Sequence, residues 1–404
     1  MTITDSNSLA DIEFQLTWKS DTATHIDKYT AQRVNFWRDC FPQQIFQKLL
    51  NKSVSEQVDC SLNSGEIVPA FQPSREHIIK SSQFDRNMDP SRRIEPRAGR
   101  FYPKGIITGM ANVFRANIEP FRCLETMDSS IRISFNHPLA SFPVNLKATI
   151  LNIHAKPVDR GGTCYDWLEV VSTGPGMQSR ANDNPTDFFS DQPFVRADEG
   201  PDDLFYAGPR FVNHLDDQAI SVISGLYAGL LKPGMHVLDL MSSWTSHLPE
   251  EIQFAKVYAL GMNPEELQAN KRLDGFVVQD INQRAVLPYE TGSLDAVICT
   301  ASIEYLIHPF EVFSEISRIL KPGGLIVITF SNRWFPPKVI QIWKDLHEFE
   351  RMGLVLEYLI GAGSFENLNT FSMRGLPRPE TDKYFGQQRF SDPVYAVWGQ
   401  KRSS

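Results

Sequence analysis

The sequence lacks a long hydrophobic run. No apolar stretch approaches the roughly 18 residues that a membrane helix needs. The first residues, MTITDSNSLADIEF, show no basic region followed by an apolar core, so we expect no secretory signal. The sequence therefore predicts a cytoplasmic protein that does not interact with membranes.

Cysteine and positive charge are also scarce. The five cysteines are scattered, odd in number and form no CxxC pair, which favours free thiols over a disulfide framework. No cysteine and histidine spacing suits a metal ion, so we expect none. There are 40 Lys and Arg against 48 Asp and Glu, a net charge of −8, which argues against nucleic acid as a bulk electrostatic partner.

The C-terminal half alternates strand and helix patterns. A helix is expected from about 264, where a proline and two acids form a good first turn, and another at 308–320, where apolar residues recur at helical spacing. Strands are expected at 236–241, 256–262, 276–281, 294–302, 325–331, 354–360 and 394–400. This order predicts an α/β fold with a Rossmann-like, doubly wound parallel sheet.

The N-terminal part differs from this pattern. Short strands are expected at 57–62, 131–135 and 144–153, with a helical stretch near 30–50. Residues 172–203 are rich in Gly, Pro, Asn and Asp, which is typical of a linker or a long ordered loop. Around Trp167, aliphatic neighbours favour a packed connector. We therefore predict a mostly-β domain at 1–155, a connector at 156–205 and the α/β domain at 206–404.

Two motifs in the C-terminal half point to a family. LPYETGSLDAVICTASIEYLIHP and EISRILKPGGLIVITFSNR lie within 287–333 at fitting spacing. They resemble the distal motifs of class I S-adenosyl-L-methionine (SAM)-dependent methyltransferases, in particular the small-molecule "type 11" group. The resemblance covers about half of the chain, from Tyr206 onward. It implies SAM as cofactor and methyl transfer to a small-molecule substrate.

The glycine-rich loop of that family is altered here. The family has VLDLGCGTG, and this chain has VLDLMSSWT, so Met241, Ser243 and Thr245 replace three glycines. Glycine in such a loop permits positive φ and close approach to the ligand. In addition, Gly261 stands where the family has an acid that binds the ribose. Either the site is remodelled and still binds SAM, or the domain binds something else or nothing.

The resemblance implies a set of cofactor-binding residues. We expect Asp239 to orient the loop, Trp244 to pack on or cover the cofactor, and Asp280 to meet the adenine amino group. Asn263 offers one weaker hydrogen bond to the ribose in place of the missing acid. The full expected set is Asp239, Met241, Ser242, Ser243, Trp244, Met262, Asn263, Asp280, Ile281 and Thr300.

The methyl acceptor is expected near the ends of the fourth and fifth strands. Glu304, His214 and His247 are alternative bases for a proton-bearing nucleophile. Arg333 and Lys338 flank an aromatic pair, which favours an anionic substrate. The absence of DPPY or NPPY after the fourth strand argues against nucleic-acid amino groups. The expected substrate-binding residues are Tyr206, Arg210, His214, Glu304, Tyr305 and Arg333.

The N-terminal part contains a second, shorter resemblance. IRISFNHPLASFPVNLKATILNI and LLNKSVSEQVDCSLNSGE are similar to segments of SlyD-like FKBP-type prolyl isomerases. Leu146 stands where that family has an aromatic residue on the last strand, and 67–130 would be a flap insert. Three alternatives stay open: a module that binds a peptide or protein, a working prolyl isomerase, and an unrelated β domain.

Overall fold

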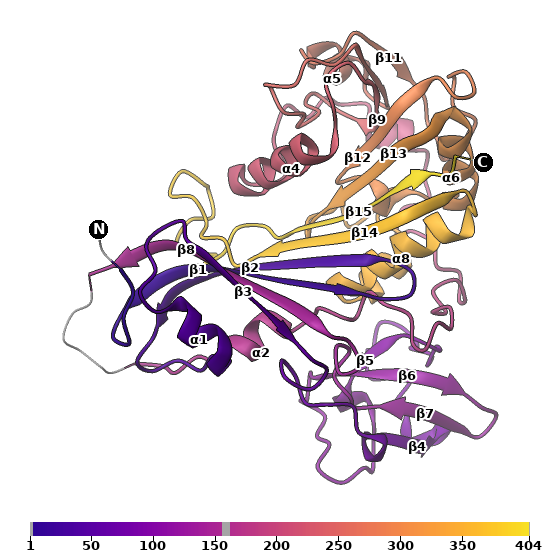
Figure 1. Ribbon diagram of the computed structural model, residues 1–404. Helices are drawn as coiled ribbons and strands as arrows, with labels where there is room; N and C mark the ends of the chain where they lie inside the picture. The colour runs from indigo at the N-terminus through magenta and orange to yellow at the C-terminus, as the bar shows by residue number, and fades with distance from the viewer. Residues whose placement is uncertain (1–2, 156–161, 404) are drawn as a thin grey trace.

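One long mixed sheet runs through the protein. The structure is a computed structural model, and it describes residues 3–155 and 162–403. Within these residues eleven strands form the order β11-β10-β9-β12-β13-β15-β14-β2-β1-β8-β3, and four more form a small sheet in the order β4-β7-β6-β5. Figure 1 shows the long sheet crossing the molecule and the small sheet set apart below it.

The elements have the following bounds. The long sheet contains β1 (Leu9–Lys19), β2 (Thr24–Asn35), β3 (Gln57–Leu62), β8 (Val144–His154), β9 (His236–Ser242), β10 (Lys256–Gly261), β11 (Gly275–Val278), β12 (Leu294–Thr300), β13 (Leu320–Phe330), β14 (Phe365–Arg374) and β15 (Val394–Lys401). The small sheet contains β4 (Glu76–Lys80), β5 (Phe101–Pro103), β6 (Pro120–Thr126) and β7 (Ser130–Ser134). The helices are α1 (Gln43–Leu49), α2 (Trp167–Ser172), α3 (Asp202–Phe205), α4 (Asp217–Leu230), α5 (Pro264–Ala269), α6 (Pro309–Ile319), α7 (Gln341–Asp345) and α8 (Glu348–Gly361).

The α/β half is covered by helices on both faces of its sheet. Strands β9 to β13 are parallel, and their side chains alternate between two apolar cores. Val237 of β9 packs in the core that contains α4, whereas Leu238 and Leu240 pack in the core that contains α6 and α8. Burial on both faces explains why these strands are near-continuous apolar runs. The predicted Rossmann-like α/β fold is confirmed for this half.

Two sequence-based assignments were wrong. Residues 354–360, expected as a strand, lie in α8, a helix buried along almost its whole length. Apart from Glu357, which is buried in an ion pair with Arg180, this segment is apolar and has no polar face to reveal its period, so strand and helix cannot be told apart. The predicted helical stretch at 30–50 is β2 up to Asn35, and only 43–49 form a helix.

The two halves share the long sheet. Strand β2 pairs in parallel with β14, from Thr24 opposite Asn369 to Tyr29 opposite Arg374. Polar side chains fix this register, since His25 Nδ1 lies 2.8 Å from Thr370 Oγ1 and Ser372 Oγ donates to Asp27 at 2.8 Å. The predicted boundary is crossed by this pairing, and a separate FKBP-like domain is not confirmed. The SlyD-like resemblance stays a prediction.

Part of the connector is buried between neighbouring elements, and its first residues, 156–161, lie outside the described part of the chain. Residues 174–179 are all buried, and Gln178 donates its side-chain amide to Asp27 at 3.3 Å. Gly174 and Gly176 have φ of +100° and +96°, and an added Cβ would meet Phe349 and Pro138 respectively at under 3 Å. The segment therefore packs β2, the turn before β8 and α8 against one another, as the packed-connector interpretation predicted.

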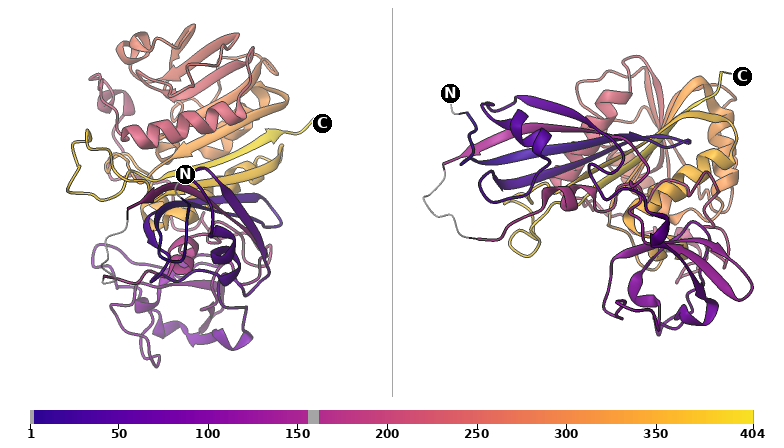
Figure 2. Two further views of the ribbon diagram at one scale, coloured as in Figure 1. Left: turned by 60° about the vertical axis from the view of Figure 1, so that its left-hand side comes forward. Right: turned by 60° about the horizontal axis from the view of Figure 1, so that its bottom comes forward.

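The small sheet is an insertion between β3 and β8. It has its own apolar core, which includes Phe84, Phe121 and Ile133. It contacts the rest of the protein through Arg122, which donates to the Ser179 carbonyl at 2.8 Å, and through the Phe101 amide, which donates to Glu350 at 2.9 Å. Figure 2 shows it projecting from the side of the long sheet.

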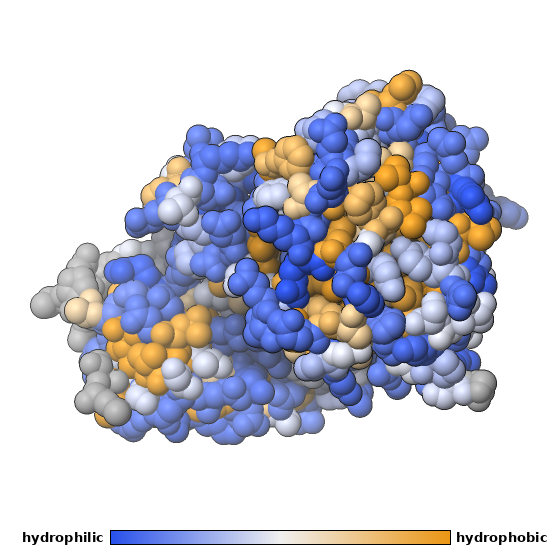
Figure 3. Space-filling view, turned by 90° about the horizontal axis from the view of Figure 1, so that it is seen from above, coloured by the Kyte–Doolittle hydropathy of each residue, from blue (hydrophilic) through white to orange (hydrophobic). Residues whose placement is uncertain are grey.

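The surface and the helix lengths fit this layered core. Hydrophilic side chains cover most of the face seen from above, with apolar patches between them (Figure 3). The longest helices, α4 and α8, have 14 residues each. Among the described residues, no helix combines the length and apolar character needed to cross a membrane.

Candidate functional site

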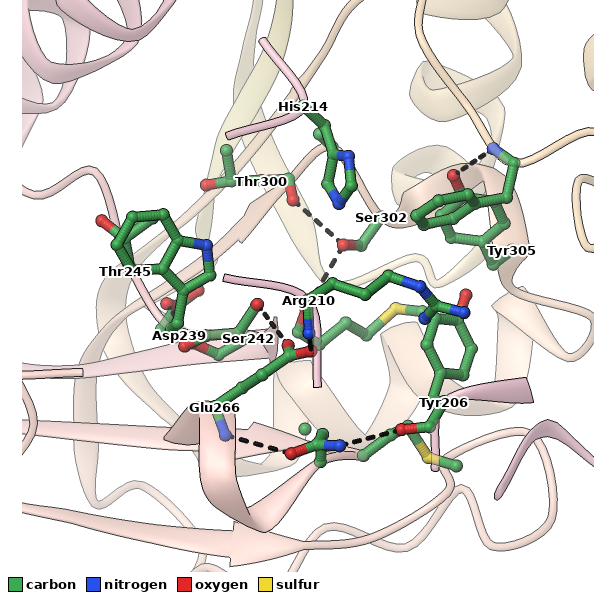
Figure 4. A pocket seen from close by; sticks show the side chains of 18 of the residues that line it. Tyr206, Arg210, His214, Asp239, Ser242, Thr245, Glu266, Thr300, Ser302 and Tyr305 are labelled. Carbon is green, nitrogen blue, oxygen red and sulfur yellow. Dashed lines mark hydrogen bonds between the residues drawn. The ribbon is translucent and has the colours of Figure 1, made fainter. Parts of the chain in front are cut away.

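A cavity of about 420 Å³ lies beyond the carboxyl ends of β9, β10, β11 and β12. Strands β10 and β11 extend the sheet on one side of β9, and β12 and β13 extend it on the other. The carboxyl end of β9 is therefore the topological switch point, where open α/β sheets bind ligands. All ten expected cofactor residues line it, as do five of the six expected substrate residues. Figure 4 shows several of these side chains entering the same space.

The altered segment that begins at the end of β9 keeps the backbone shape that glycine usually supplies. Met241 has φ of +58°, and His247 and Ala301, which also line the cavity, have φ of +53° and +47°. Such left-handed residues cost roughly 1–3 kcal/mol each and cluster at functional sites. Met241 therefore occupies the conformation expected of the first glycine despite its side chain.

Hydrogen bonds from side chains hold this loop in place. Ser242 Oγ donates to Asp239 at 2.6 Å, and Ser243 Oγ donates to Glu266 at 2.5 Å. Asn270 donates its amide to the Ser243 carbonyl at 3.0 Å. Burial raises the pKa of Asp239 to about 7, although the hydrogen bonds from Ser242 and Ser246 oppose this. These hydrogen bonds hold the loop in a backbone conformation that usually requires glycine.

The missing acid at Gly261 follows from the same change. Ser242 extends β9 and pairs with Gly261 after a register shift at the end of β10. A Cβ at position 261 would lie 2.3 Å from the Ser242 carbonyl oxygen. An aspartate or glutamate therefore cannot occupy this position without moving the loop. The replacement of the glycines and the absence of the acid are therefore parts of one structural change.

Glu266 brings a carboxylate to the part of the cavity where Gly261 has none. It lies in the first turn of α5, is 9% exposed, and lines the cavity. One of its oxygens accepts from Ser243 Oγ, and the other accepts from the Arg210 amide at 2.6 Å. Each carboxylate oxygen has a second lone pair for a ligand. Sequence reasoning noted this acid only as part of a helix start.

The opposite wall of the cavity is aromatic. The Phe335 ring is the common contact, with ring centroids 5.0 Å from His214, 5.9 Å from Tyr305 and 6.4 Å from Tyr206. The Arg210 guanidinium lies 5.3 Å from the same ring. Tyr305 is held in place because the Phe335 amide donates to its hydroxyl at 2.8 Å.

Comparison with known proteins identifies the α/β half. Residues 242–328 match the family described as "Methyltransferase domain". The α/β half is therefore similar to methyltransferases over these residues. The match begins at the altered loop and ends within β13. The match supports the predicted SAM-dependent methyltransferase, and with it the SAM cofactor expected from the sequence.

Individual relatives match this domain over part of their length. A ubiquinone biosynthesis O-methyltransferase of Xanthomonas oryzae pv. oryzae is 28% identical over 109 residues, which cover 27% of this chain and 41% of that protein. An uncharacterised chloroplastic methyltransferase of Arabidopsis thaliana is 37% identical over 87 residues, which cover 22% and 24%. The chain spans 24% and 41% of the length of the first two curated relatives it matches.

One solved structure matches about half of this chain over most of its own length. The SAM-dependent methyltransferase of Aquifex aeolicus is 16% identical, with a TM-score of 0.31. The matched part covers 46% of this chain and 91% of that one.

One expected contact between the α/β half and the cofactor is not available. Asn263 Oδ1 accepts from the amides of Glu265 and Glu266, both at 3.0 Å, and its Nδ2 donates to the carbonyls of Tyr206 and Ala207. Both lone pairs and both hydrogens are therefore used, because this amide caps α5. The expected hydrogen bond from Asn263 to the ribose is a wrong prediction.

Glu304 does not line the cavity, which corrects its assignment as a substrate-binding residue and candidate base. It is 1% exposed, and its Oε2 has no hydrogen-bond partner among the described residues. Burial raises its pKa to about 8, so it is protonated at neutral pH. The short helical turn at Ile303–Tyr305 directs its side chain into the core while Tyr305 reaches the cavity.

Other residues expected at the site line the cavity. Arg333 reaches the cavity but is paired with Asp392 at 2.9 Å. Thr300 bonds to the Tyr227 hydroxyl at 2.6 Å, and Asp280 accepts from the Asn282 amide at 2.9 Å. Burial lowers the pKa of His247 to about 4, so this cavity residue is neutral at physiological pH.

Several cavity residues were missed in the sequence. Lys383 and Tyr384 come from the segment between β14 and β15, where no periodic pattern pointed to the site. Phe335 was visible only as part of an aromatic pair. Asp202, from the connector, was not expected at the cavity. It is bound by Arg196 and Lys338 at 2.8 and 3.1 Å.

Proposed function

We propose that this protein transfers a methyl group from SAM to a small-molecule acceptor in the cavity at the end of β9. The observation that supports this most is that the cavity stays open although the glycines are replaced. Its volume of about 420 Å³ lies within the range typical of ligand pockets. A loop whose side chains filled the cleft would have favoured a non-catalytic protein instead.

The residues present fit the cofactor. We infer that Glu266 takes the part of the missing acid and accepts the ribose hydroxyls, and that Asp280 and Ile281 border the adenine. Trp244 donates its indole N–H to the Val212 carbonyl at 3.3 Å, so it joins the loop to the segment that covers the cavity. SAM supplies an electrophilic methyl group on its sulfonium. The protein supplies orientation, which is the main requirement of this reaction.

We infer that His214 is the base for a proton-bearing acceptor. It lines the cavity, and burial with the nearby Arg210 lowers its pKa, so the ring is neutral and able to accept a proton at physiological pH. Tyr206 and Phe335 would hold the acceptor in place beside it. Among the three alternatives, Glu304 is excluded by its position, and His247 lies in the strained loop after β9.

The N-terminal half supports the structure of the α/β half. Its strand β2 completes the sheet next to β14, and the buried connector fixes it against α8. Binding of a peptide or protein by residues 3–155 stays a prediction, as does prolyl isomerase activity.

Calorimetric titration of the full chain with SAM and S-adenosylhomocysteine tests the proposal. We expect one molecule of either ligand to bind per chain. The alternative is a protein whose methyltransferase fold serves binding or assembly. Absence of heat from either ligand at millimolar concentration would favour that alternative and would contradict the proposal.

A further inference from the structure

Two positively charged side chains on the acceptor side of the cavity have no acidic partner among the described residues. Arg210 and Lys383 both line it, and neither forms an ion pair with a carboxylate within the described ranges 3–155 and 162–403. The Arg210 guanidinium donates to the Phe205 carbonyl at 2.8 Å, which leaves most of its five N–H groups free. Arg210 is half-buried and Lys383 is exposed to solvent, so both cations are accessible to a ligand in the cavity.

The acids of the cavity do not balance these cations. Asp202 is neutralised by Arg196 and Lys338, and Glu266 accepts from Ser243 and from the Arg210 backbone, away from its guanidinium. Asp239 lies beneath the loop after β9, bound to Ser242. Asp280 accepts from the Asn282 amide near the end of β11. None of the four forms an ion pair with Arg210 or Lys383.

Aromatic rings surround the same cations. The Arg210 guanidinium lies 4.7 Å from the Phe205 ring, 5.6 Å from Tyr206 and 5.3 Å from Phe335. The Lys383 ammonium lies 5.0 Å from the Tyr384 ring. The His214 ring also contacts the Phe335 ring, with centroids 5.0 Å apart, so His214 and Arg210 lie beside the same ring. Figure 4 shows Arg210, His214 and Tyr206 pointing into one space.

We propose, building on the methyltransferase function above, that the acceptor is a hydroxylated aromatic acid. Its ring would stack in the aromatic wall around Phe335, and its carboxylate would bind between Arg210 and Lys383. The hydroxyl would face His214, which would accept its proton. The O–CH3 bond would form as the S–CH3 bond of SAM breaks, and S-adenosylhomocysteine would be the leaving group. A planar guanidinium that is held by rings is well suited to a carboxylate, because bidentate pairs add both strength and orientation.

The test measures acceptor binding separately from cofactor binding. The full chain is saturated with S-adenosylhomocysteine and titrated with 4-hydroxybenzoate and caffeate, and then with the amides of the same acids. We expect at least one acid to bind, and to bind about tenfold more tightly than its amide, since a charge-assisted contact is lost in the amide. Lys383→Met should reduce this difference, because Arg210 alone then contacts the carboxylate, and Lys383→Arg should retain it.

The exposed Lys232, beyond the end of α4 and outside the cavity, gives a matched control. Lys232→Met should leave both the acid and the amide unchanged. Equal binding of acid and amide, or binding of neither while S-adenosylhomocysteine binds, would overturn the assignment of the acceptor and leave the proposed function intact. So would a Lys383→Met variant that weakens S-adenosylhomocysteine but not the acid. A chain that does not bind S-adenosylhomocysteine would overturn the proposed function and this inference together.

Discussion

Two turns of the methyltransferase domain adopt left-handed backbone conformations by different means. In the KPGG turn before the main part of β13, Gly323 has φ of +74°, and a Cβ there would meet nothing within 4 Å. In the loop after β9, Met241 has φ of +58° and is held by neighbouring contacts. The first turn uses glycine for its conformational freedom alone. The second tolerates strain because Ser242, Ser243 and Asn270 fix its surroundings, and it lies at the cavity.

The largest effect is expected from restoring the acid at the end of β10. Gly261→Asp places a Cβ against the Ser242 carbonyl, a backbone atom that cannot rotate away. We expect a loss of roughly 3–5 kcal/mol in the free energy of unfolding and loss of SAM binding. Urea denaturation and calorimetry measure the two effects.

Gly229→Ala in α4 is the control for this substitution, because nothing lies within 4 Å of the added Cβ. It should leave SAM binding unchanged and should stabilise the helix by up to about 1 kcal/mol. A stable Gly261→Asp variant that binds SAM more tightly would show that the loop adapts, and would break the proposed link between the two altered positions.

The next effect is a pH dependence from the two buried carboxyls near the site. Burial raises the pKa of Glu304 to about 8 and that of Asp239 to about 7. The folded protein therefore keeps protons that the unfolded chain releases above about pH 4–5, so stability falls as pH rises. Between pH 6 and pH 8 we expect Glu304 alone to contribute a loss of roughly 2–3 kcal/mol.

Urea denaturation from pH 5 to pH 8 checks this dependence. Glu304→Gln should make the profile less steep and leave only the part due to Asp239, because the amide resembles the protonated acid and cannot ionise. Glu290→Gln, at an exposed glutamate, should leave it unchanged. A profile that rises through this range, or one that Glu304→Gln does not alter, would contradict the assignment of a buried, protonated Glu304.

The smallest effects compare the two left-handed positions directly. Gly323→Ala should cost about 1–2 kcal/mol, because only the backbone conformation opposes the methyl group. Met241→Gly should change stability by less than about 1 kcal/mol, since released strain offsets the lost packing of a partly buried side chain. Thermal or urea denaturation gives both values. A large loss in Met241→Gly would mean that its side chain, and not the loop, sets the shape of the site.

The sequence predicted the sheet of the methyltransferase domain well, because buried parallel strands are apolar runs bounded by turns. It failed at α8, where an apolar run gives no period, and at the pairing of β2 with β14, which joins segments more than 300 residues apart. At the site, the strand ends placed Ser242 and Asp280 at the cavity, and the segment upstream of β9 placed Tyr206 there. Glu266 and Lys383 were missed because their approach to the cavity depends on tertiary packing, which spacing does not reveal.

In the proposed site, Glu266 and the loop held by Ser242 and Ser243 replace the acid and the three glycines of the family pattern. Titration of SAM into the wild-type chain and into Glu266→Gln tests this most directly. We predict one bound SAM per wild-type chain and a weakening of about tenfold or more in the variant, since a carboxylate accepts hydrogen bonds more strongly than an amide. Equal affinity in the two proteins, or no binding to the wild type, would contradict the account.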